Sequence, residues 1–281
     1  MTEQDLRPQI KVKTHRLYLD AILDTEVLKI SDTSTLNYLK NVLRLKTNSL
    51  LRIFDKSENE YLLKINEIQN KYILLEKIET LSENKEVNPL DKPITKIAKN
   101  EFVAGICLLK PEKMREAVDV ATQMGVSEIQ PIISDRCQNF GINLDKIKTW
   151  AIEASEQSER LSIPIINSPL KLRDFVNANV NINDFSKNRN DKIVVANEHF
   201  GVNIKDIFKE KILSSEEKNF QTPNANQTPK FYGCIIGPEG GFSNEDLKLL
   251  NSDNIINVNL GSTILKSHVA LAKILSFFCE N

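Results

Sequence analysis

Hydrophobic positions along the first 80 residues fall into short runs separated by polar turns. In segment 50–69 two apolar runs flank a turn-prone stretch, a pattern typical of a β-hairpin, and 71–80 predicts a further strand. Residues 34–46 differ because their apolar positions recur at helical spacing, which predicts a helix with Thr33 or Ser34 as its N-cap. The pattern predicts a small β-barrel with one helix.

Beyond residue 96 the pattern changes to an alternation of apolar strands and amphipathic helices. Pro111 in a first turn and Gly125 after a last turn mark the ends of one predicted helix. Strands are predicted at 102–109, 128–134, 192–198, 231–237 and 256–261, and helices at 111–126, 145–161, 204–213, from 243 and at 266–279. Such alternation predicts an α/β domain, in which helices cover both faces of a mostly parallel sheet.

Composition along the chain predicts where the domains divide. Residues 81–96 are polar and contain two prolines, so we expect a linker there, between a β-barrel domain at 1–80 and an α/β domain at 97–281. Residues 213–229 have a polar, low-complexity composition and are expected to form a mobile insertion.

Overall composition narrows the class of protein. The 281 residues are 41% hydrophobic and 27% charged, as in ordinary soluble proteins. No apolar run approaches the roughly 20 residues of a membrane span, and the N-terminus lacks an apolar signal core, so we expect a cytoplasmic protein without membrane contact. The net charge of −1 argues against an indiscriminate nucleic-acid binder but permits a local basic patch. The four cysteines and three histidines are scattered, so neither a metal site nor a disulfide framework is expected.

The stretch CIIGPEGGFSNEDL at 234–247 joins a predicted strand to a helix through a glycine-rich turn. It lacks the Lys and Ser/Thr of a phosphate loop, and the carboxylate of Glu239 would repel a phosphate. A second turn, in NLGSTIL, also follows a strand. Because ligands collect at the carboxyl ends of parallel strands, we expect the turns to share a pocket with apolar walls from Leu260, Ile264 and Leu265. Such a pocket suits adenine, and Glu239 suits a positive group such as a sulfonium, although each turn alone is more simply structural.

Several charged residues could carry chemistry or simply face solvent. Glu153, Gln157 and Arg160 share one face of a predicted helix, beside Glu156, and a solvated helix face is the alternative. Asp135 and Arg136 come immediately after a predicted strand, where a functional loop or a plain turn is expected. Basic residues of the N-terminal domain could bind phosphates or be solvated, namely Arg7, Lys11, Lys13, Arg16, Lys40, Arg44, Lys46 and Arg52.

Five stretches, taken in order, carry a resemblance to a known family. They are HRLYL with YLKNVLRLKTNSLLRIFD, then LLKPEKMREAVDVATQMGVSEIQPIISDRC, EASEQSERLSIP, IIGPEGGFSNEDL and LGSTILKSHVALA. The chain resembles, over nearly its whole length, the bacterial methyltransferases that modify N3 of a uridine in 16S ribosomal RNA, which belong to the SPOUT superfamily.

The resemblance implies a fold, a cofactor and partners that the residues alone do not give. The fold would be a SPOUT-type trefoil knot in a mostly parallel sheet, after a PUA-like RNA-binding domain. The cofactor would be S-adenosyl-L-methionine, bound chiefly by backbone. The partners would be 16S ribosomal RNA in the assembled small subunit, and a second copy in a homodimer whose active sites are completed across the interface. The implied cofactor-binding residues are Ile236, Gly237, Pro238, Gly240, Gly241, Leu260, Gly261, Ile264 and Leu265, and the implied RNA-binding residues are Arg16, Arg44, Lys46, Lys110 and Arg160.

The implied reaction needs a base, because uracil N3 carries a proton at neutral pH and must lose it before attacking the methyl group. Glu239 and Glu156 are the candidate bases, and Arg136 and Lys266 are the candidate cations that bind RNA or stabilise the developing anion. No metal is needed, because the sulfonium already supplies the leaving group.

The last motif departs from the family pattern, which reads close to L-G-x-R-I-L-R-x-E-T-A. Thr263 and Lys266 lie where the family commonly has arginines, and His268 lies where a glutamate is usual. Lysine keeps the charge of arginine but loses its planar fork. Two alternatives therefore stay open: a weakened or inactive RNA-binding ribosome-assembly factor, and a SPOUT methyltransferase that acts on another RNA.

Overall fold

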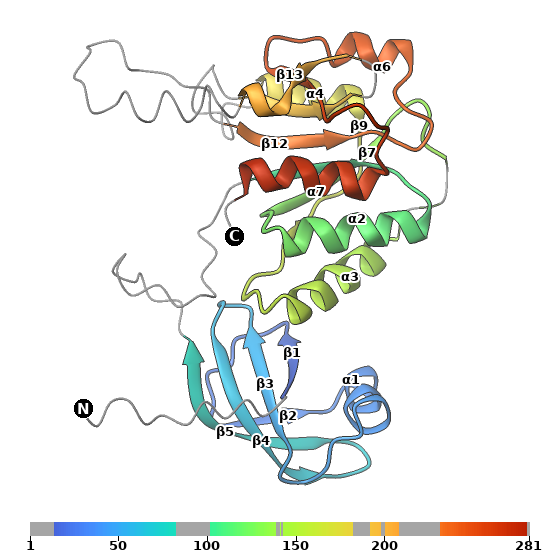
Figure 1. The fold of residues 1–281 in the computed structure, drawn as a ribbon. Coiled ribbons are helices and arrows are strands. Elements are labelled where there is room, and N and C mark those ends of the chain that lie inside the picture. The colour runs from blue at the N-terminus through green and yellow to red at the C-terminus, as the bar shows by residue number, and fades with distance from the viewer. Residues whose placement is uncertain are drawn as a thin grey trace, which may run out of the picture. The chain divides into compact units, whose positions relative to one another are not determined.

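The protein consists of two compact units, Met1–Pro93 and Ile94–Asn281 (Figure 1). The computed structural model describes residues 14–82, 102–138, 141, 143–181, 192–197, 200–207 and 231–279. The predicted insertion and the predicted linker beyond Ser82 lie outside these ranges, so the predicted domain boundaries stay predictions.

The first unit contains a five-stranded sheet with the order β1-β3-β4-β5-β2. Its strands are β1 (His15–Leu19), β2 (Val27–Ile30), β3 (Leu50–Asp55), β4 (Glu60–Ile68) and β5 (Ile73–Ser82). β1 runs parallel to β3, whereas the other pairs are antiparallel. The predicted hairpin, now β3 and β4, and the predicted strand that follows it are confirmed.

A short helical segment covers part of this sheet. It consists of α1 (Thr33–Asn37) and the π-helical turn η2 (Tyr38–Val42), and its Leu36 and Leu39 are buried in the core of the unit. The predicted N-cap was wrong, because Asp32 caps α1 by accepting a hydrogen bond from the backbone N–H of Thr35 at 2.9 Å. The carboxylate of Asp32, one residue before Thr33, reaches a free N–H of the first turn, so that Thr33 and Ser34 lie inside the helix.

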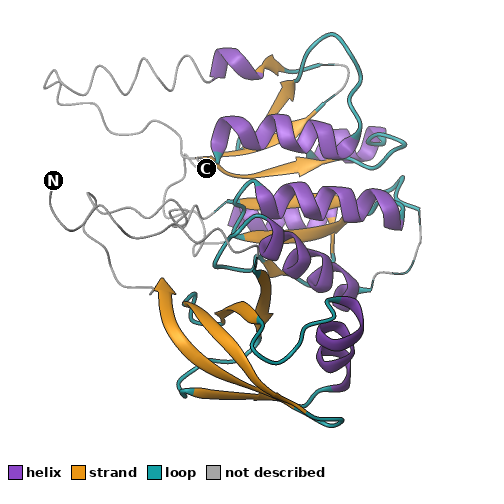
Figure 2. Ribbon diagram, turned by 60° about the horizontal axis from the view of Figure 1, so that its bottom comes forward, coloured by secondary structure: helices purple, strands orange, loops and turns teal. Residues whose placement is uncertain are grey.

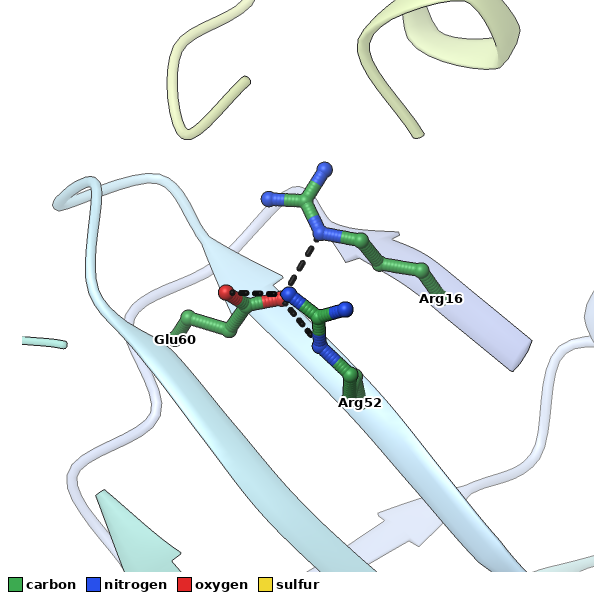
Figure 3. A network of polar contacts seen from close by, with 3 residues as sticks. All are labelled: Arg16, Arg52 and Glu60. Carbon is green, nitrogen blue, oxygen red and sulfur yellow. Dashed lines mark hydrogen bonds and ion pairs between the residues drawn. The ribbon is translucent and has the colours of Figure 1, made fainter. Parts of the chain in front are cut away.

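An ion-pair network fixes one end of the β3–β4 hairpin to β1 (Figure 3). Glu60 accepts hydrogen bonds from Arg16 at 2.7 Å and from two nitrogens of Arg52, each at 3.1 Å. The side chains of Arg16 and Glu60 are only 5% and 4% exposed, and Arg16 also lies 3.9 Å from the ring centre of Phe54. The predicted RNA-binding residue Arg16 is thus engaged in holding the sheet together.

The second unit contains an eight-stranded sheet in which every strand pair is parallel, in the order β11-β13-β10-β12-β6-β7-β8, with β9 also on β7. Its strands are β6 (Val103–Cys107), β7 (Glu128–Ile133), β8 (Ile165–Ile166), β9 (Leu170–Lys171), β10 (Lys192–Ala196), β11 (Val202–Asn203), β12 (Phe231–Ile236) and β13 (Ile255–Asn259). The parallel sheet and its five predicted strands are confirmed.

Helices pack on both faces of this sheet, as predicted. One core joins the sheet to α2 (Pro111–Gln123), α3 (Leu144–Gln157) and α7 (Ser267–Phe278), and a separate core joins it to α4 (Leu172–Asn181) and the end of α6 (Asn244–Leu249). Figure 2 distinguishes the helices and strands of this unit by colour, and it shows that strands predominate in the first unit. Among the described helices, none combines the length and the apolar composition that a bilayer crossing requires.

We expect Glu60→Gln to destabilise the first unit by about 3 kcal/mol, because it leaves the buried cation of Arg16 without its counter-charge. Hydrogen exchange of the β3 and β4 amides in the full chain measures the effect locally. Glu76→Gln is the matched control, since Glu76 is an exposed carboxylate on the same sheet that accepts a hydrogen bond from Asn66. Equal exchange in the two variants would contradict this account of the network.

Candidate functional site

A cavity of about 620 Å³ lies at the carboxyl ends of the central strands of the second unit. β10 pairs with both β12 and β13, and its Val195 lies opposite Ile235 on one side and Asn257 on the other. The three strands therefore end at one edge of the sheet. The two glycine-bearing turns that follow β12 and β13 both line the cavity, as the sequence predicts.

The first turn, Gly237–Gly241, is shaped by backbone that a side chain would disturb. The N–H of Gly241 donates to the carbonyl of Pro238 at 2.9 Å, and Gly241 has a φ of +67°, which favours glycine. A Cβ on Gly237 would lie 2.9 Å from the ring of Phe242. Glycine at these positions therefore permits a tight turn whose backbone faces the cavity.

The second turn is held by polar contacts on both sides. The N–H of Gly261 donates to the side-chain oxygen of Asn259 at 2.7 Å, and Gly261 has a φ of +129°. Lys273 from α7 donates to the carbonyl of Leu260 at 2.5 Å. These contacts fix the backbone of Leu260 and Gly261, so that apolar side chains and peptide groups line this wall of the cavity.

A polar latch ties the first turn to the end of β7. Ser243 caps α6 in a capping box with the buried Asp246, and its hydroxyl also donates to Asp135 at 2.6 Å. Next to Asp135, the guanidinium of Arg136 donates to the carbonyl of Gly240 at 3.1 Å. The loop after β7 thus holds the glycine turn in place and brings the charge of Arg136 to the cavity.

The charge lining the cavity is mostly positive. Lys110, Lys113, Arg136 and Lys266 contribute cations, and Glu239 contributes the carboxylate among the described lining residues. Glu239 accepts a hydrogen bond from the backbone N–H of Lys110 at 3.2 Å, which places it at the start of α2. A carboxylate among cations is an arrangement that can accept a proton and stabilise the anion left behind.

The predicted cofactor-binding residues all line this cavity, and so do the predicted Lys110, Arg136, Glu239 and Lys266. Their roles stay predictions. Lining residues that the sequence did not single out for this role are Lys113, Ala196, Asn197, Phe242, Leu247, Thr263, Ser267 and Ala270. One signal for Lys113 was available, because it lies one helical turn after Lys110.

The remaining predicted residues lie elsewhere. Glu156 is a half-buried residue of α3 that does not line the cavity. Arg160 is 6% exposed and donates to the carbonyls of Thr122 and Val126 at 2.8 and 2.6 Å, which commits it to the fold and argues against its predicted contact with RNA. Arg44 and Lys46 are exposed on the first unit, where their RNA-binding role is untested.

Two cysteines lie close to the latch. Burial raises the pKa of the Cys107 thiol. The pKa of Cys137 is instead lowered to about 6, because hydrogen bonds from Cys107 and Ser134 stabilise its thiolate more than burial disfavours it. The four cysteines are free thiols. Within the described ranges, no three His, Cys, Asp or Glu side chains gather as a metal-binding group.

We expect iodoacetamide to alkylate Cys137 much faster than the other cysteines at neutral pH. Because the pKa of Cys137 is lowered to about 6, most of this thiol is the reactive thiolate at neutral pH, whereas Cys107, Cys234 and Cys279 are buried. Peptide-resolved mass spectrometry across about pH 5 to 9 should show the Cys137 rate rising through pH 6 and then levelling. A rate that is low at neutral pH and keeps rising to pH 9 would contradict the lowered pKa.

Family models match both parts of the chain. An RNA methyltransferase domain matches residues 96–278, and an RNA methyltransferase PUA domain matches residues 30–78. The first model alone spans more than half of the chain.

Solved structures share the fold. A methyltransferase from Legionella pneumophila with bound SAM superposes with a TM-score of 0.72 at 22% identity, covering 94% of this chain and 96% of that one. Ribosomal RNA small subunit methyltransferase E from Neisseria gonorrhoeae, bound to S-adenosyl methionine, has a TM-score of 0.67 at 17% identity, covering 94% and 95%. These structures share the predicted mostly parallel sheet with helices, and the PUA domain model supports the predicted PUA-like first domain. The SPOUT-type trefoil knot stays a prediction.

Two relatives by sequence carry the same name. Ribosomal RNA small subunit methyltransferase E of Rickettsia conorii is 30% identical over 277 residues, covering 96% of this chain and 99% of the relative. The protein of that name from Buchnera aphidicola of Acyrthosiphon pisum is 26% identical over 264 residues, covering 92% and 90%. The chain therefore belongs to the ribosomal RNA small subunit methyltransferase E family.

Proposed function

We propose that this protein transfers a methyl group from S-adenosylmethionine to N3 of a uridine in 16S ribosomal RNA. The observation that carries the proposal is the cavity where the turns after β12 and β13 meet, with Glu239 among several cations. The names of the relatives at 30% and 26% identity support the same substrate class.

The cavity residues fit the proposed cofactor. A volume of about 620 Å³ lies within the range of small-molecule sites. Leu260, Leu265 and Ile236 provide apolar surface for an adenine, and the backbone of the two turns provides donors and acceptors. Bound S-adenosylmethionine supplies the methyl group, already activated on a positive sulfur.

The chain's own residues then have to handle one proton and one negative charge. Glu239 is the proposed base for the N3 proton, and the N–H of Lys110 holds its carboxylate at 3.2 Å. Arg136 is fixed by its bond to Gly240, and together with Lys266 it is proposed to stabilise the uracil anion as the proton leaves. Glu156 does not line the cavity and is the weaker candidate base.

We further propose a homodimer that works in the cytoplasm on the assembled small subunit. Two exposed apolar side chains support this proposal: Ile264, which lines the cavity, is 73% exposed, and Val269 of α7 is 40% exposed. A second copy over this surface would complete the active site, and Glu156 would have a catalytic role only through such an interface.

The test is methyl transfer from labelled S-adenosylmethionine to small subunits that lack this modification. We expect labelled 3-methyluridine at a single site after nuclease digestion and mass spectrometry, because N3 is the atom that Glu239 would deprotonate. Label in another nucleoside would favour a different RNA substrate. Cofactor binding without label on any RNA would overturn the catalytic proposal in favour of an RNA-binding assembly factor.

Glu239→Gln should lower the single-turnover rate about 100-fold in this assay, since general base catalysis typically contributes that much or more. Glu245→Gln is the matched control, because Glu245 is an exposed carboxylate on α6 that does not line the cavity. A rate for Glu239→Gln equal to that of the control would remove Glu239 from the mechanism.

A further inference from the structure

A second carboxylate lies just behind the cavity wall, where α2 and α7 pack together. Glu116 of α2 does not line the cavity, but two of its neighbours do: Lys113, one turn earlier on α2, and Lys266, the N-cap residue of α7. His268, in the first turn of α7, also faces Glu116. None of these residues except Lys266 has a role in the reaction proposed above.

The contacts of Glu116 hold these groups together. Its two carboxylate oxygens lie 2.8 and 2.9 Å from the ammonium nitrogen of Lys113. One of the same oxygens lies 2.9 Å from Nδ1 of His268. This second contact has the distance of an ion pair, but Nδ1 is buried without a hydrogen bond of suitable direction. The Lys113 contact is therefore the hydrogen-bonded one, and the His268 contact is one of close packing.

The charge states agree with this geometry. The hydrogen bond to Glu116 raises the pKa of Lys113, and burial opposes this shift. The hydrogen bond from Lys113 lowers the pKa of Glu116 against the effect of burial, and the charges of Lys113, His268 and Lys266 add to this lowering. At neutral pH Lys113 is therefore an ammonium and Glu116 a carboxylate.

The pair differs from an ordinary surface ion pair on a helix. Lys248 and Glu245 of α6 have the same spacing of three residues, but their side chains are 71% and 68% exposed, against 36% and 42% for Lys113 and Glu116. Both pairs nevertheless contact solvent, and ion pairs that contact solvent contribute little to the stability of the fold. Lys113 also lies within electrostatic range of Glu239, the proposed base. Its position at the cavity wall therefore matters more for a ligand than for the fold.

We propose that Lys113 is a further substrate-binding residue, which contacts an anionic oxygen of the target nucleotide, and that Glu116 is its positioning residue. The inference rests on the proposed function. As Glu239 takes up a proton its charge disappears, while a negative charge appears on the substrate. An ammonium already held at the wall can then stabilise that charge without reorganising. His268 packs against one of the two Glu116 oxygens that contact Lys113, which limits the rotation of the carboxylate.

The experiment measures single-turnover methylation of small subunits and, separately, the Kd of S-adenosylmethionine. We expect Lys113→Gln to lower the rate about tenfold, as the loss of one charge-assisted contact would, and to change the cofactor Kd less than about twofold. Lys113→Arg should keep the rate within about threefold, because it keeps the charge. Lys248→Gln, from the matched pair on α6, should leave both quantities unchanged.

A double-mutant cycle tests the positioning role of Glu116. Glu116→Gln alone should lower the rate about threefold, but it should have no further effect in the Lys113→Gln background, because its contribution passes through Lys113. An equal effect in both backgrounds would mean a merely structural role. A loss in the rate at saturating subunits would assign the contact to the uracil ring, and a loss only in the KM for subunits would assign it to a phosphate.

Two outcomes would overturn the inference while leaving the proposed function intact. One is wild-type methylation with an unchanged rate for Lys113→Gln, and the other is a weakened cofactor Kd that accounts for the whole loss. An inactive wild-type chain that still binds its cofactor would overturn the proposed function and the inference together, so the two failures are distinguishable.

Discussion

The parallel pairing of β10 with both β12 and β13 is the constraint on which the site depends. Parallel strands that are neighbours end at the same edge of a sheet, so the chain that leaves β12 and the chain that leaves β13 must turn close together. The hydrogen bond from the N–H of Asn197 to the carbonyl of Val258, at 3.0 Å, continues this pairing to the rim of the cavity. The glycines, the latch at Asp135 and the apolar wall at Leu260 refine a pocket that the sheet order creates.

Much of the fold could be predicted because its strands are buried on both faces. Such strands appear as unbroken apolar runs, and Pro111 and Gly125 marked the helix between two of them. The strands and the helix that the sequence did not predict lack such an apolar run. β8, β9 and β11 have two residues each, too few for a period, and α4 contains several asparagines that disfavour a helix. The cap of α1 was missed because Asp32 precedes the apolar pattern by several residues.

The candidate site, like the fold, could be predicted only in part. Local sequence predicts the two glycine turns, since a strand, a turn and a helix follow one another within a few residues. It does not predict contacts between distant segments, such as Glu116 with His268, or the latch between Asp135 and Ser243. Nor does it predict the partners of Arg160, because the two carbonyl groups that accept its hydrogen bonds come near only in the folded chain.

The central claim is that the backbone of the two turns binds S-adenosylmethionine. Hydrogen exchange of the full chain with and without the cofactor tests it most directly, because it reads individual peptide segments rather than activity. The account predicts that the cofactor slows exchange in the segments containing Gly237–Gly241 and Leu260–Gly261, while exchange in β3 and β4 of the first unit is unchanged. Cofactor binding with no protection in either turn would contradict the account.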